Sequence, residues 1–474
     1  MQTDKHIHIL GICGTAMAAI ASLAKEQGYR VTGSDSGIYP PMSDYLAALA
    51  IPVQAFDAAN LLPAPDLCVI GIAMSRGNVE VEAILNKGLA YCSGPEFIGK
   101  HILPQRHAIV VAGTHGKTTT ASLMAHVLES AGKKAGKGPG FMIGGIPEDF
   151  GGGARLGSGE HFVLEGDEYD TAFFDKRSKF LHYHARTLIL NNLEFDHADI
   201  FADLEAIKVQ FAHLLRTVPA DGKIIVNADD ENLADVIPRG CWSPVTRFAR
   251  LGHADAPWQW QPLADDGTAF EILHQGQPFL SVSWNMLGIH NVSNACAVTA
   301  AAHVLGIERD IIAQALASFS GIRRRMTLVG EANGVRIFDD FAHHPTAING
   351  VVAAAKHAMK SSGKLWVIVE PRSNTMRTRI HQQRLPASFE YADRVIFVPP
   401  SSRNLRPDEV LDADQVCRDI GTHASVLPDT NAIIDYLCAE SHAGDVILIL
   451  SNGGFDGIHQ RLLDRLSRTP PYNN

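Results

Sequence analysis

A strand that leads into a glycine-rich turn and then a helix constrains this sequence more than any other segment. Residues 108–112 are small or apolar, and residues 113–118 read Gly-Thr-His-Gly-Lys-Thr. Glycines let backbone N–H groups turn inward, and a lysine at the start of a helix adds positive potential. The segment therefore predicts a cradle for the phosphates of a nucleoside triphosphate. The alternative is a plain strand-turn-helix corner with a surface lysine.

This loop is shorter than the common phosphate-binding pattern G-x-x-x-x-G-K-[ST]. Val111 stands five residues before Gly116, where that pattern has a glycine. Helix-forming residues continue over 121–128. The strand before the loop and the helix after it favour the phosphate interpretation. The residues expected at the nucleotide are Gly113, Thr114, His115, Gly116, Lys117, Thr118 and Thr119.

Composition limits the class of protein. A chain of 474 residues with 46% hydrophobic and 19% charged residues is too long for one core, and we expect three domains. No stretch reaches the roughly 18 to 20 apolar residues of a membrane span, and the start lacks a signal peptide, so we expect a cytoplasmic protein without a membrane partner. The net charge of −10 argues against nucleic-acid binding. The seven cysteines form no CxxC pair and are typical of free thiols.

The first hundred residues alternate strands and helices as nucleotide-binding folds do. A strand over 6–10 is followed by a second over 29–32, after which Asp35 stands where such folds bind a ribose or a base. Cys13 and Ala16 occupy the second and third glycine positions of the G-x-G-x-x-G fingerprint, so a dehydrogenase is disfavoured. A purely structural turn remains an equal alternative.

Two later strands end in acidic residues. They cover 161–170 and 187–197. The carboxyl ends of parallel strands share one edge of a sheet with the phosphate loop, so these carboxylates could hold Mg²⁺ against a triphosphate. Glu165 and His197 are the metal ligands expected from this placement. Helix capping is the favoured role for each of Asp167, Glu168 and Asp170.

Other segments carry less chemistry. The glycine-rich run 138–145 predicts a loop, and 242–277 predicts an irregular β excursion. Strands separated by helical stretches resume after 335 and predict another parallel, doubly wound sheet. The tail 469–474 is expected to be disordered.

Five motifs stand in one order along the chain. They are residues 113–119, 165–170, 196–197, 290–294 and 339–346. Together they resemble the Mur ligase superfamily over nearly the whole length. The resemblance implies an ATP-dependent ligase that activates a carboxylate as an acyl phosphate, which an amine then attacks with release of ADP and phosphate.

The resemblance also implies an α/β fold of three domains, each built on a mostly parallel doubly wound sheet. Residues 1–104 would form a Rossmann-like domain for a UDP-sugar, 105–321 a central P-loop ATPase domain, and 322–474 a Rossmann-like ligase domain that closes on both. The implied cofactors are ATP and Mg²⁺. We expect a monomer or a weak homodimer.

The resemblance also implies roles for the residues of these motifs. Lys117, Glu165 and His197 would be catalytic. Thr118 or Thr119 would place a hydroxyl on a first Mg²⁺, and Glu165 with His197 would hold a second. The nucleotide would also contact Asn291, Asn294, Arg325 and Asp340. The UDP-sugar and the peptide would contact Gly11, Gly14, Thr15, Asp35, Ser75, His344, Arg372, Asn374 and Arg377.

Within the superfamily, the sequence is most similar to the branch that acts in peptidoglycan recycling. That branch joins L-Ala-γ-D-Glu-meso-diaminopimelate to UDP-N-acetylmuramate. Five segments carry this similarity, namely residues 38–43, 173–180, 191–201, 370–376 and 451–455. The alternative is the ligase that adds L-alanine during synthesis, which usually carries Pro-His-Arg-Tyr where this chain has Pro-Arg-Ser-Asn over 371–374. A folate-type polyglutamate synthetase and a nucleotide-gated binding protein are rival classes, which the complete first domain and the joint presence of Glu165 and His197 disfavour.

Overall fold

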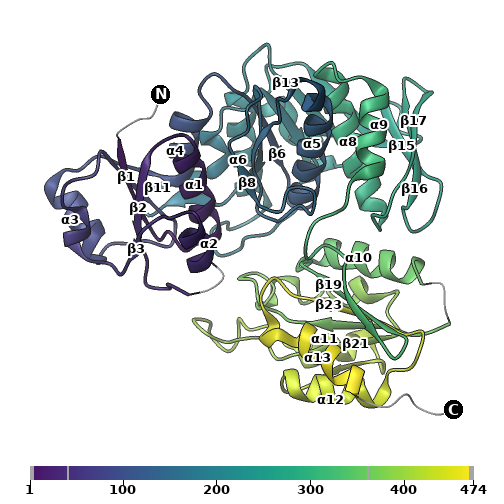
Figure 1. Cartoon of the computed structure of the whole chain (residues 1–474). Helices are drawn as coiled ribbons and strands as arrows, with labels where there is room; N and C mark the ends of the chain where they lie inside the picture. The colour runs from purple at the N-terminus through teal and green to yellow at the C-terminus, as the bar shows by residue number, and fades with distance from the viewer. Residues whose placement is uncertain (1–4, 40–41, 360–361, 469–474) are drawn as a thin grey trace.

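The structure of the chain is a computed structural model that describes residues 5–39, 42–359 and 362–468. Three large sheets, of five, ten and six strands, follow one another along the chain, and a two-stranded sheet accompanies the second. We call the regions built on them the N-terminal, central and C-terminal units (Figure 1). The expected α/β fold with mostly parallel sheets is confirmed. The tail 469–474 lies outside the described residues, and the domain boundaries after 104 and 321 stay predictions.

The N-terminal sheet has five parallel strands. They are β1 (His6–Leu10), β2 (Arg30–Ser34), β3 (Val53–Gln54), β4 (Leu67–Ile70) and β5 (Tyr91–Ser93). The helices of this unit are α1 (Thr15–Glu26), α2 (Met42–Ala48), α3 (Val79–Lys87) and α4 (Gly94–Phe97). The strand order is β3-β2-β1-β4-β5. Ile7 and Ile9 of β1 pack with α1, whereas Leu10 packs with α3 on the other face, so the sheet is doubly wound.

The central sheet has ten strands in the order β17-β16-β15-β14-β13-β12-β6-β9-β7-β8. The strands are β6 (His107–Ala112), β7 (Gly140–Met142), β8 (Ala154–Arg155), β9 (His161–Gly166), β12 (Thr187–Leu190), β13 (Lys223–Asn227), β14 (Val245–Arg250), β15 (Trp258–Pro262), β16 (Ala269–His274) and β17 (Gln277–Ser283). The run from β7 to β15 is parallel. A separate hairpin joins β10 (Asp170–Ala172) to β11 (Asp175–Ser178).

Helices cover both faces of the central sheet. They are α5 (Lys117–Gly132), α6 (Leu204–Thr217), α7 (Glu231–Val236), α8 (Ile289–Val304) and α9 (Arg309–Ser318). Ile109 and Val111 of β6 pack with α5 and α8, whereas Val110 packs with α6. A strand covered on both faces is apolar at every position, which explains the continuous apolar run before the phosphate loop.

Two expectations about the central unit are wrong. The run 138–145 contains strand β7, in which Phe141 is fully buried, rather than loop alone. The short strand stays paired with β9 because Gly140 lies against Phe162, where a Cβ atom would come within 2.3 Å of the ring. The segment 242–277 is regular rather than irregular, since its strands extend the sheet and bury Trp258 in the core.

The C-terminal sheet has six strands in the order β18-β19-β23-β20-β21-β22. The strands are β18 (Thr327–Ala332), β19 (Val335–Asp340), β20 (Leu365–Val369), β21 (Arg394–Phe397), β22 (Ala424–Val426) and β23 (Val446–Leu450). Only β18 pairs in an antiparallel manner among these. Helices α10 (Pro345–His357) and α11 (Ala413–Ile420) cover one face, and α12 (Thr430–Glu440) and α13 (Ile458–Arg468) cover the other. The predicted parallel, doubly wound sheet is confirmed.

The outer units meet the central unit in different ways. Ile98 and Ile102 of the N-terminal unit belong to the same buried apolar cluster as Phe180 and Tyr183 of the central unit. The C-terminal unit has its own two apolar clusters. It meets the central unit through polar contacts, such as the bond from the Asn374 amide to an Asp199 oxygen at 2.9 Å.

Two further expectations concern the whole chain. No helix in the described ranges has the length and hydropathy needed to cross a membrane. All seven cysteines are free, as their spacing predicts.

Candidate active site

A cavity of about 1050 Å³ lies among the three units and includes the loops that follow β6, β9 and β12. Residues of all three units line it. Thr15 belongs to the N-terminal unit, Lys117 and Glu165 to the central unit, and Asp340 and His344 to the C-terminal unit. Ligands of open parallel sheets bind at the carboxyl ends of the strands, so this cavity is the candidate active site.

The phosphate loop has the backbone that its glycines predict. Gly113 and Gly116 have φ values of +142° and +78°, which side-chain-bearing residues rarely adopt. A Cβ atom on Gly116 would also lie 2.8 Å from an Asn294 oxygen. The His115 N–H donates to the Asn192 side chain at 2.7 Å, which fixes the loop against the strand-end segment after β12.

Lys117 folds back over this loop instead of pointing into solvent. Its Nζ donates to the Gly113 carbonyl at 2.7 Å and to a Glu168 oxygen at 3.0 Å, and its side chain is 15% exposed. Burial alone would lower the pKa of Lys117, but the carboxylates of Glu168, Asp167 and Glu165 together outweigh it and raise that pKa. The lysine therefore stays charged, and the alternative of a surface lysine is wrong.

Asp167, Glu168 and His197 form one compact group, which we call the carboxylate-histidine cluster. Their ligand atoms lie within 4.8 Å of one another. The Nε2 of His197 lies 3.1 Å from a Glu168 oxygen. Burial opposes the charge on His197, but the carboxylates of Glu168 and Asp196 raise its pKa. The cluster therefore contains mutually stabilising charges beside the phosphate loop.

Helix capping, the favoured role for the three acids after β9, is wrong. The chain enters the β10–β11 hairpin there rather than a helix. Asp167 accepts from Lys179 at 2.6 Å, and Asp170 accepts from Lys176 at 2.6 Å. Each acid is therefore an ion-pair partner.

Glu165 lies in a different setting from Glu168. One oxygen accepts from the Gly144 N–H at 2.7 Å, and the Thr118 hydroxyl also hydrogen-bonds the carboxyl group. Burial raises the pKa of Glu165. The structure thus brings together Glu165 and Thr118 of the expected metal ligands, whereas His197 lies beside Glu168 instead. Thr118, Glu165 and His197 all line the same cavity.

The two amides expected at the nucleotide lie at the start of α8. Asn291 and Asn294 are both buried and line the cavity. The Asn294 amide donates to the Asn291 oxygen at 3.1 Å, while Asn291 donates to the Leu287 carbonyl at 2.8 Å. Their mutual bond fixes both side chains next to the phosphate loop.

Arg325 and Asp340 reach the same cavity from the other side. Asp340 accepts from the backbone N–H groups of Met326 and Ala342, at 2.7 and 2.8 Å. Arg325 lies over the ring of Phe341 at 5.4 Å. Burial raises the pKa of Asp340, and the Arg325 charge opposes that rise.

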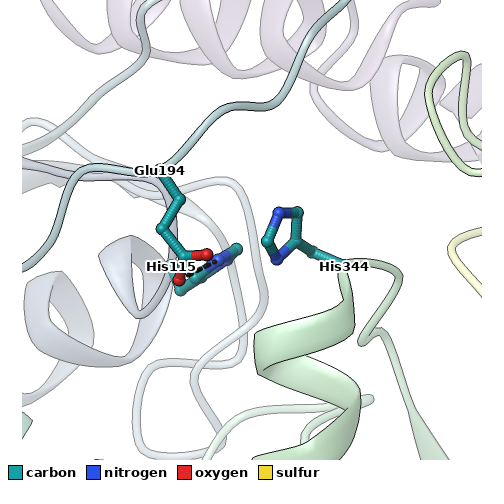
Figure 2. A group of neighbouring side chains, drawn as sticks. All are labelled: His115, Glu194 and His344. Carbon is teal, nitrogen blue, oxygen red and sulfur yellow. Dashed lines mark ion pairs between the residues drawn. The ribbon is translucent and has the colours of Figure 1, made fainter. Parts of the chain in front are cut away.

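His115, Glu194 and His344 form a second group, which we call the interunit cluster (Figure 2). The Nε2 of His115 lies 3.5 Å from one Glu194 oxygen, and the two imidazole rings are 4.4 Å apart. The other Glu194 oxygen accepts from Thr346 at 2.8 Å and from Arg384 at 2.9 Å. Burial and the neighbouring His115 lower the pKa of His344 to about 3. This group connects the phosphate loop to the C-terminal unit.

A smaller cavity of about 370 Å³ adjoins the main one. Arg372, Asn374, His197 and His343 are among the residues that line it. The Arg372 guanidinium is 56% exposed and lies 3.6 Å from Glu370, so the local pairing does not bury its charge. The third residue expected at the peptide, Arg377, instead donates to the Arg403 carbonyl at 2.8 Å.

The residues expected at the UDP-sugar surround the first turn of the N-terminal unit. Both Asp35 oxygens accept backbone N–H bonds, from Cys13 at 2.9 Å and from Gly37 at 2.8 Å. Gly11 has a φ of +74°, and Thr15 lines the main cavity. The remaining two residues lie in the turns that follow β1 and β4: Gly14 and Ser75. Asp35 therefore has a structural role in the turn, beside any role at a ligand.

Comparison with known proteins matches every unit to one family. Residues 6–106 match the catalytic domain of the Mur ligase family, 111–302 the Mur ligase middle domain, and 324–453 the Mur ligase glutamate ligase domain. A relative from Escherichia coli (strain K12), a UDP-N-acetylmuramate–L-alanyl-γ-D-glutamyl-meso-2,6-diaminoheptandioate ligase, is 46% identical over 98% of both chains. The chain belongs to the Mur ligase family.

Other members of the Mur ligase family share the fold at different levels of identity. A crystal structure of a murein peptide ligase from Psychrobacter arcticus 273-4 is 42% identical, covers 98% of this chain and 99% of its own, and has a TM-score of 0.73. A UDP-N-acetylmuramate–L-alanine ligase from Pelotomaculum thermopropionicum is 32% identical over 98% of both chains. The expected class of enzyme, an ATP-dependent amide ligase that forms ADP, is confirmed by this membership.

Sequence reasoning missed some residues that the structure brings to this Mur ligase site. Glu194, which lies inside the strand-end segment 187–197, contacts both the phosphate loop and the C-terminal unit. Thr346 lies at the end of another such motif. Arg384 stands outside every motif, and only the docking of the two units brings it to Glu194.

Proposed function

We propose that this Mur ligase joins the tripeptide L-Ala-γ-D-Glu-meso-diaminopimelate to UDP-N-acetylmuramate in an ATP-dependent reaction of peptidoglycan recycling. The proposal rests on a difference in sequence identity: this chain is more similar to a relative named for the tripeptide than to one named for L-alanine. A ligase named for this tripeptide is 46% identical over 98% of the chain, whereas an L-alanine ligase of equal coverage is 32% identical. The main cavity, which all three units line, offers space for the three substrates.

The reaction has two steps. A carboxylate oxygen of the muramate lactyl group attacks the γ-phosphorus of ATP, which forms an acyl phosphate and releases ADP. The tripeptide's amino nitrogen then attacks the acyl carbon, loses a proton and displaces phosphate, which leaves a new amide bond. Catalysis of such transfers comes from positioning and from charge stabilisation, so the site needs fixed cations near the phosphates.

Lys117 is the principal cation for the nucleotide. Its charge lies against the phosphate loop, where it neutralises the β- and γ-phosphates, and the N–H groups at the start of α5 hold the same oxygens. Asn291 and Asn294 bracket the adenine at the start of α8. Arg325 and Asp340 complete the nucleotide site from the C-terminal unit.

The buried donor atoms near the loop also suit Mg²⁺, which prefers oxygen ligands. Thr118 and Glu165 share a hydrogen bond and line the cavity together. The Thr118 hydroxyl would contact a first ion, and Glu165 with His197 would hold a second, with Glu168 orienting the His197 ring through its 3.1 Å contact. When bound, Mg²⁺ neutralises charge on the transferred phosphoryl group.

The peptide would lie in the smaller cavity, next to the reacting centre. Arg372 has an exposed guanidinium there, and Asn374 supplies an amide. Such groups suit the several carboxylates of the tripeptide through charge-assisted hydrogen bonds. His344 and Arg377 would support this region, and the UDP-sugar would occupy the N-terminal turn near Thr15. The three domains proposed for these tasks are residues 1–104, 105–321 and 322–474.

Release of phosphate tests the proposal. With ATP, Mg²⁺ and UDP-N-acetylmuramate present, we expect the tripeptide to raise phosphate release well above the rate without an amine. Omission of UDP-N-acetylmuramate should abolish the effect, which separates a ligase from a simple ATPase. Rapid release with L-alanine and slow release with the tripeptide would contradict the proposal and favour the L-alanine-adding activity.

A further inference from the structure

The interunit cluster has the donor atoms of a transition-metal site. We propose that His115, Glu194 and His344 bind a divalent ion of the Zn²⁺ class, and that the bound ion connects the phosphate loop to the C-terminal unit. Two imidazoles and one carboxylate form a common ligand set for Zn²⁺ and its neighbours in the first transition row. The proposal concerns binding of the ion and does not depend on the reaction assigned above.

The three side chains come from separate parts of the fold. His115 belongs to the phosphate loop, Glu194 follows β12, and His344 caps α10. Figure 2 shows the Glu194 carboxylate beside the His115 ring, with the His344 ring facing them from the C-terminal unit. All three side chains line the main cavity, so an ion can reach them from solvent.

The distances are close to those of a bound ion. The three ligand atoms lie within 4.8 Å of one another, and the His115 and Glu194 atoms are 3.5 Å apart. Zn²⁺ binds imidazole nitrogen at about 2.0–2.1 Å, which in a tetrahedral site separates ligand atoms by roughly 3.4 Å. Small rotations of the side chains would therefore bring the ligands onto one ion.

One ligand atom has no partner that would compete with the ion. The His115 Nε2 is buried and accepts or donates no hydrogen bond among the residues that the structure describes. Glu194 uses its other oxygen for Thr346 and Arg384, so the oxygen that faces His115 remains available. Among the described residues, the His344 Nδ1 accepts one long backbone bond, at 3.3 Å from the Thr346 nitrogen, while its Nε2 lies 3.3 Å from the Phe195 carbonyl oxygen.

The carboxylate-histidine cluster is a less suitable site for the same ion. The Lys117 ammonium lies 3.0 Å from Glu168, and the Lys179 ammonium lies 2.6 Å from Asp167. Both cations repel a divalent ion before any nucleotide is bound. In the interunit cluster, one guanidinium contacts the carboxylate, and it does so on the oxygen that faces away from His115. Zn²⁺ should therefore select the interunit cluster in the nucleotide-free protein.

The test measures Zn²⁺ affinity of the full-length protein without nucleotide, by competition with a chromophoric zinc chelator. We expect one site with a dissociation constant of about 10 µM or lower. His344→Ala should weaken binding at least about 10-fold. Glu194→Gln, which keeps the shape of the side chain, should do the same. Replacement of Zn²⁺ by Co²⁺ should give a visible absorption band that both variants lose.

His197→Ala is the matched control because it removes a histidine of the other cluster. It should keep both the zinc affinity and the cobalt band. Thermal unfolding without metal shows whether each variant folds, and a variant that does not fold is replaced by His344→Gln. The proposal is overturned if the wild type binds no Zn²⁺ below about 100 µM. Equal affinity in His344→Ala, or loss of the site in His197→Ala alone, would also overturn it.

Discussion

The two histidine clusters of this Mur ligase differ in where their residues originate. Asp167, Glu168 and His197 all follow strands of the central sheet. The interunit cluster needs His344 from the C-terminal unit to join His115 and Glu194. The Lys117 ammonium forms an ion pair with the carboxylate-histidine cluster. The interunit cluster is instead held by Arg384 and Thr346, which contact Glu194 across the boundary between the two units. One group is thus complete in the central unit alone, and the other exists only when two units are docked.

This difference assigns the two clusters to different tasks. The carboxylate-histidine cluster belongs to the phosphate-binding region, and the interunit cluster belongs to the contact between two units. The central unit presents its phosphate loop, lysine and acids without help, so the phosphate end of the proposed nucleotide site is preorganised. The interunit cluster forms only when the C-terminal unit, whose Arg372 and Asn374 line the smaller cavity, lies against that site. The polar nature of the seam fits a contact that opens and closes, because polar interfaces within a chain resemble transient ones.

Lys117→Ala should produce the largest effect, since it removes the central cation of the first group. We expect ATP turnover to fall by about 100-fold or more, as for other fixed charge stabilisers. Calorimetry should show nearly unchanged affinity for UDP-N-acetylmuramate, because the sugar-nucleotide turn lies in the N-terminal unit. The control Lys176→Ala removes a lysine that is 70% exposed, and its turnover should change less than about twofold. Equal losses of sugar-nucleotide affinity and of turnover would contradict the assignment.

His197→Ala should have the next largest effect. The Mg²⁺ concentration needed for half-maximal activity should rise by about 10- to 100-fold, because the ring would complete a site that Glu165 alone holds loosely. A titration of activity with Mg²⁺ measures this. His161→Gln, at the opposite end of β9, should leave the requirement unchanged. A variant that unfolds earlier but keeps the original Mg²⁺ requirement would reduce His197 to a packing role.

Glu194→Gln tests the second group by itself. The Arg384 side chain is 50% exposed, and ion pairs of that kind contribute about 0.5–1 kcal/mol. We therefore expect a twofold to fivefold loss, about what such a free energy gives, in kcat/KM for the tripeptide. Nucleotide affinity should stay unchanged. Glu205→Gln disrupts a surface pair with Arg239 within the central unit and should have no effect. An equal loss of nucleotide affinity in Glu194→Gln would show that the two groups are not independent.

The pH dependence of stability should give the smallest effect. Glu168 and Asp196 raise the pKa of His197 above its ordinary value of 6.5 in the folded protein. The stabilisation from this charge is therefore complete below pH 6.5 and is lost as the pH rises through the higher folded-state pKa. The melting temperature of wild type relative to His197→Ala should decrease by about 1–2 °C between about pH 6 and pH 9. A difference that grows with pH would contradict the pairing with Glu168.

The fold was largely predictable, for a physical reason. Strands such as β6 and β20 are buried on both faces, so their apolar runs stand out between glycine turns. Predictions failed where the structure of a segment depends on its pairing with strands elsewhere in the chain. The strand over 140–142 depends on pairing with β9, and the segment 242–277 becomes regular only because its strands extend an existing sheet.

The site was predictable to the extent that motifs contain it. Lys117, Glu165, His197 and the two amides of α8 all line one cavity, as the order of motifs suggested. The role of Glu168 was missed, since only the fold shows that Lys117 turns back toward it. Contacts across the seam, such as Arg384 with Glu194, join residues about two hundred positions apart and leave no local pattern in the sequence.

Competition between amines tests the proposed function most directly. Equal concentrations of L-Ala-γ-D-Glu-meso-diaminopimelate and L-alanine would be supplied with ATP, Mg²⁺ and UDP-N-acetylmuramate, and mass spectrometry would count the two products. We predict that the tripeptide product exceeds the alanine product by at least about 10-fold, because remote contacts supply binding energy that free alanine cannot use. Arg372→Ala should reduce that ratio. A larger yield of the alanine product in the wild type would contradict the assignment.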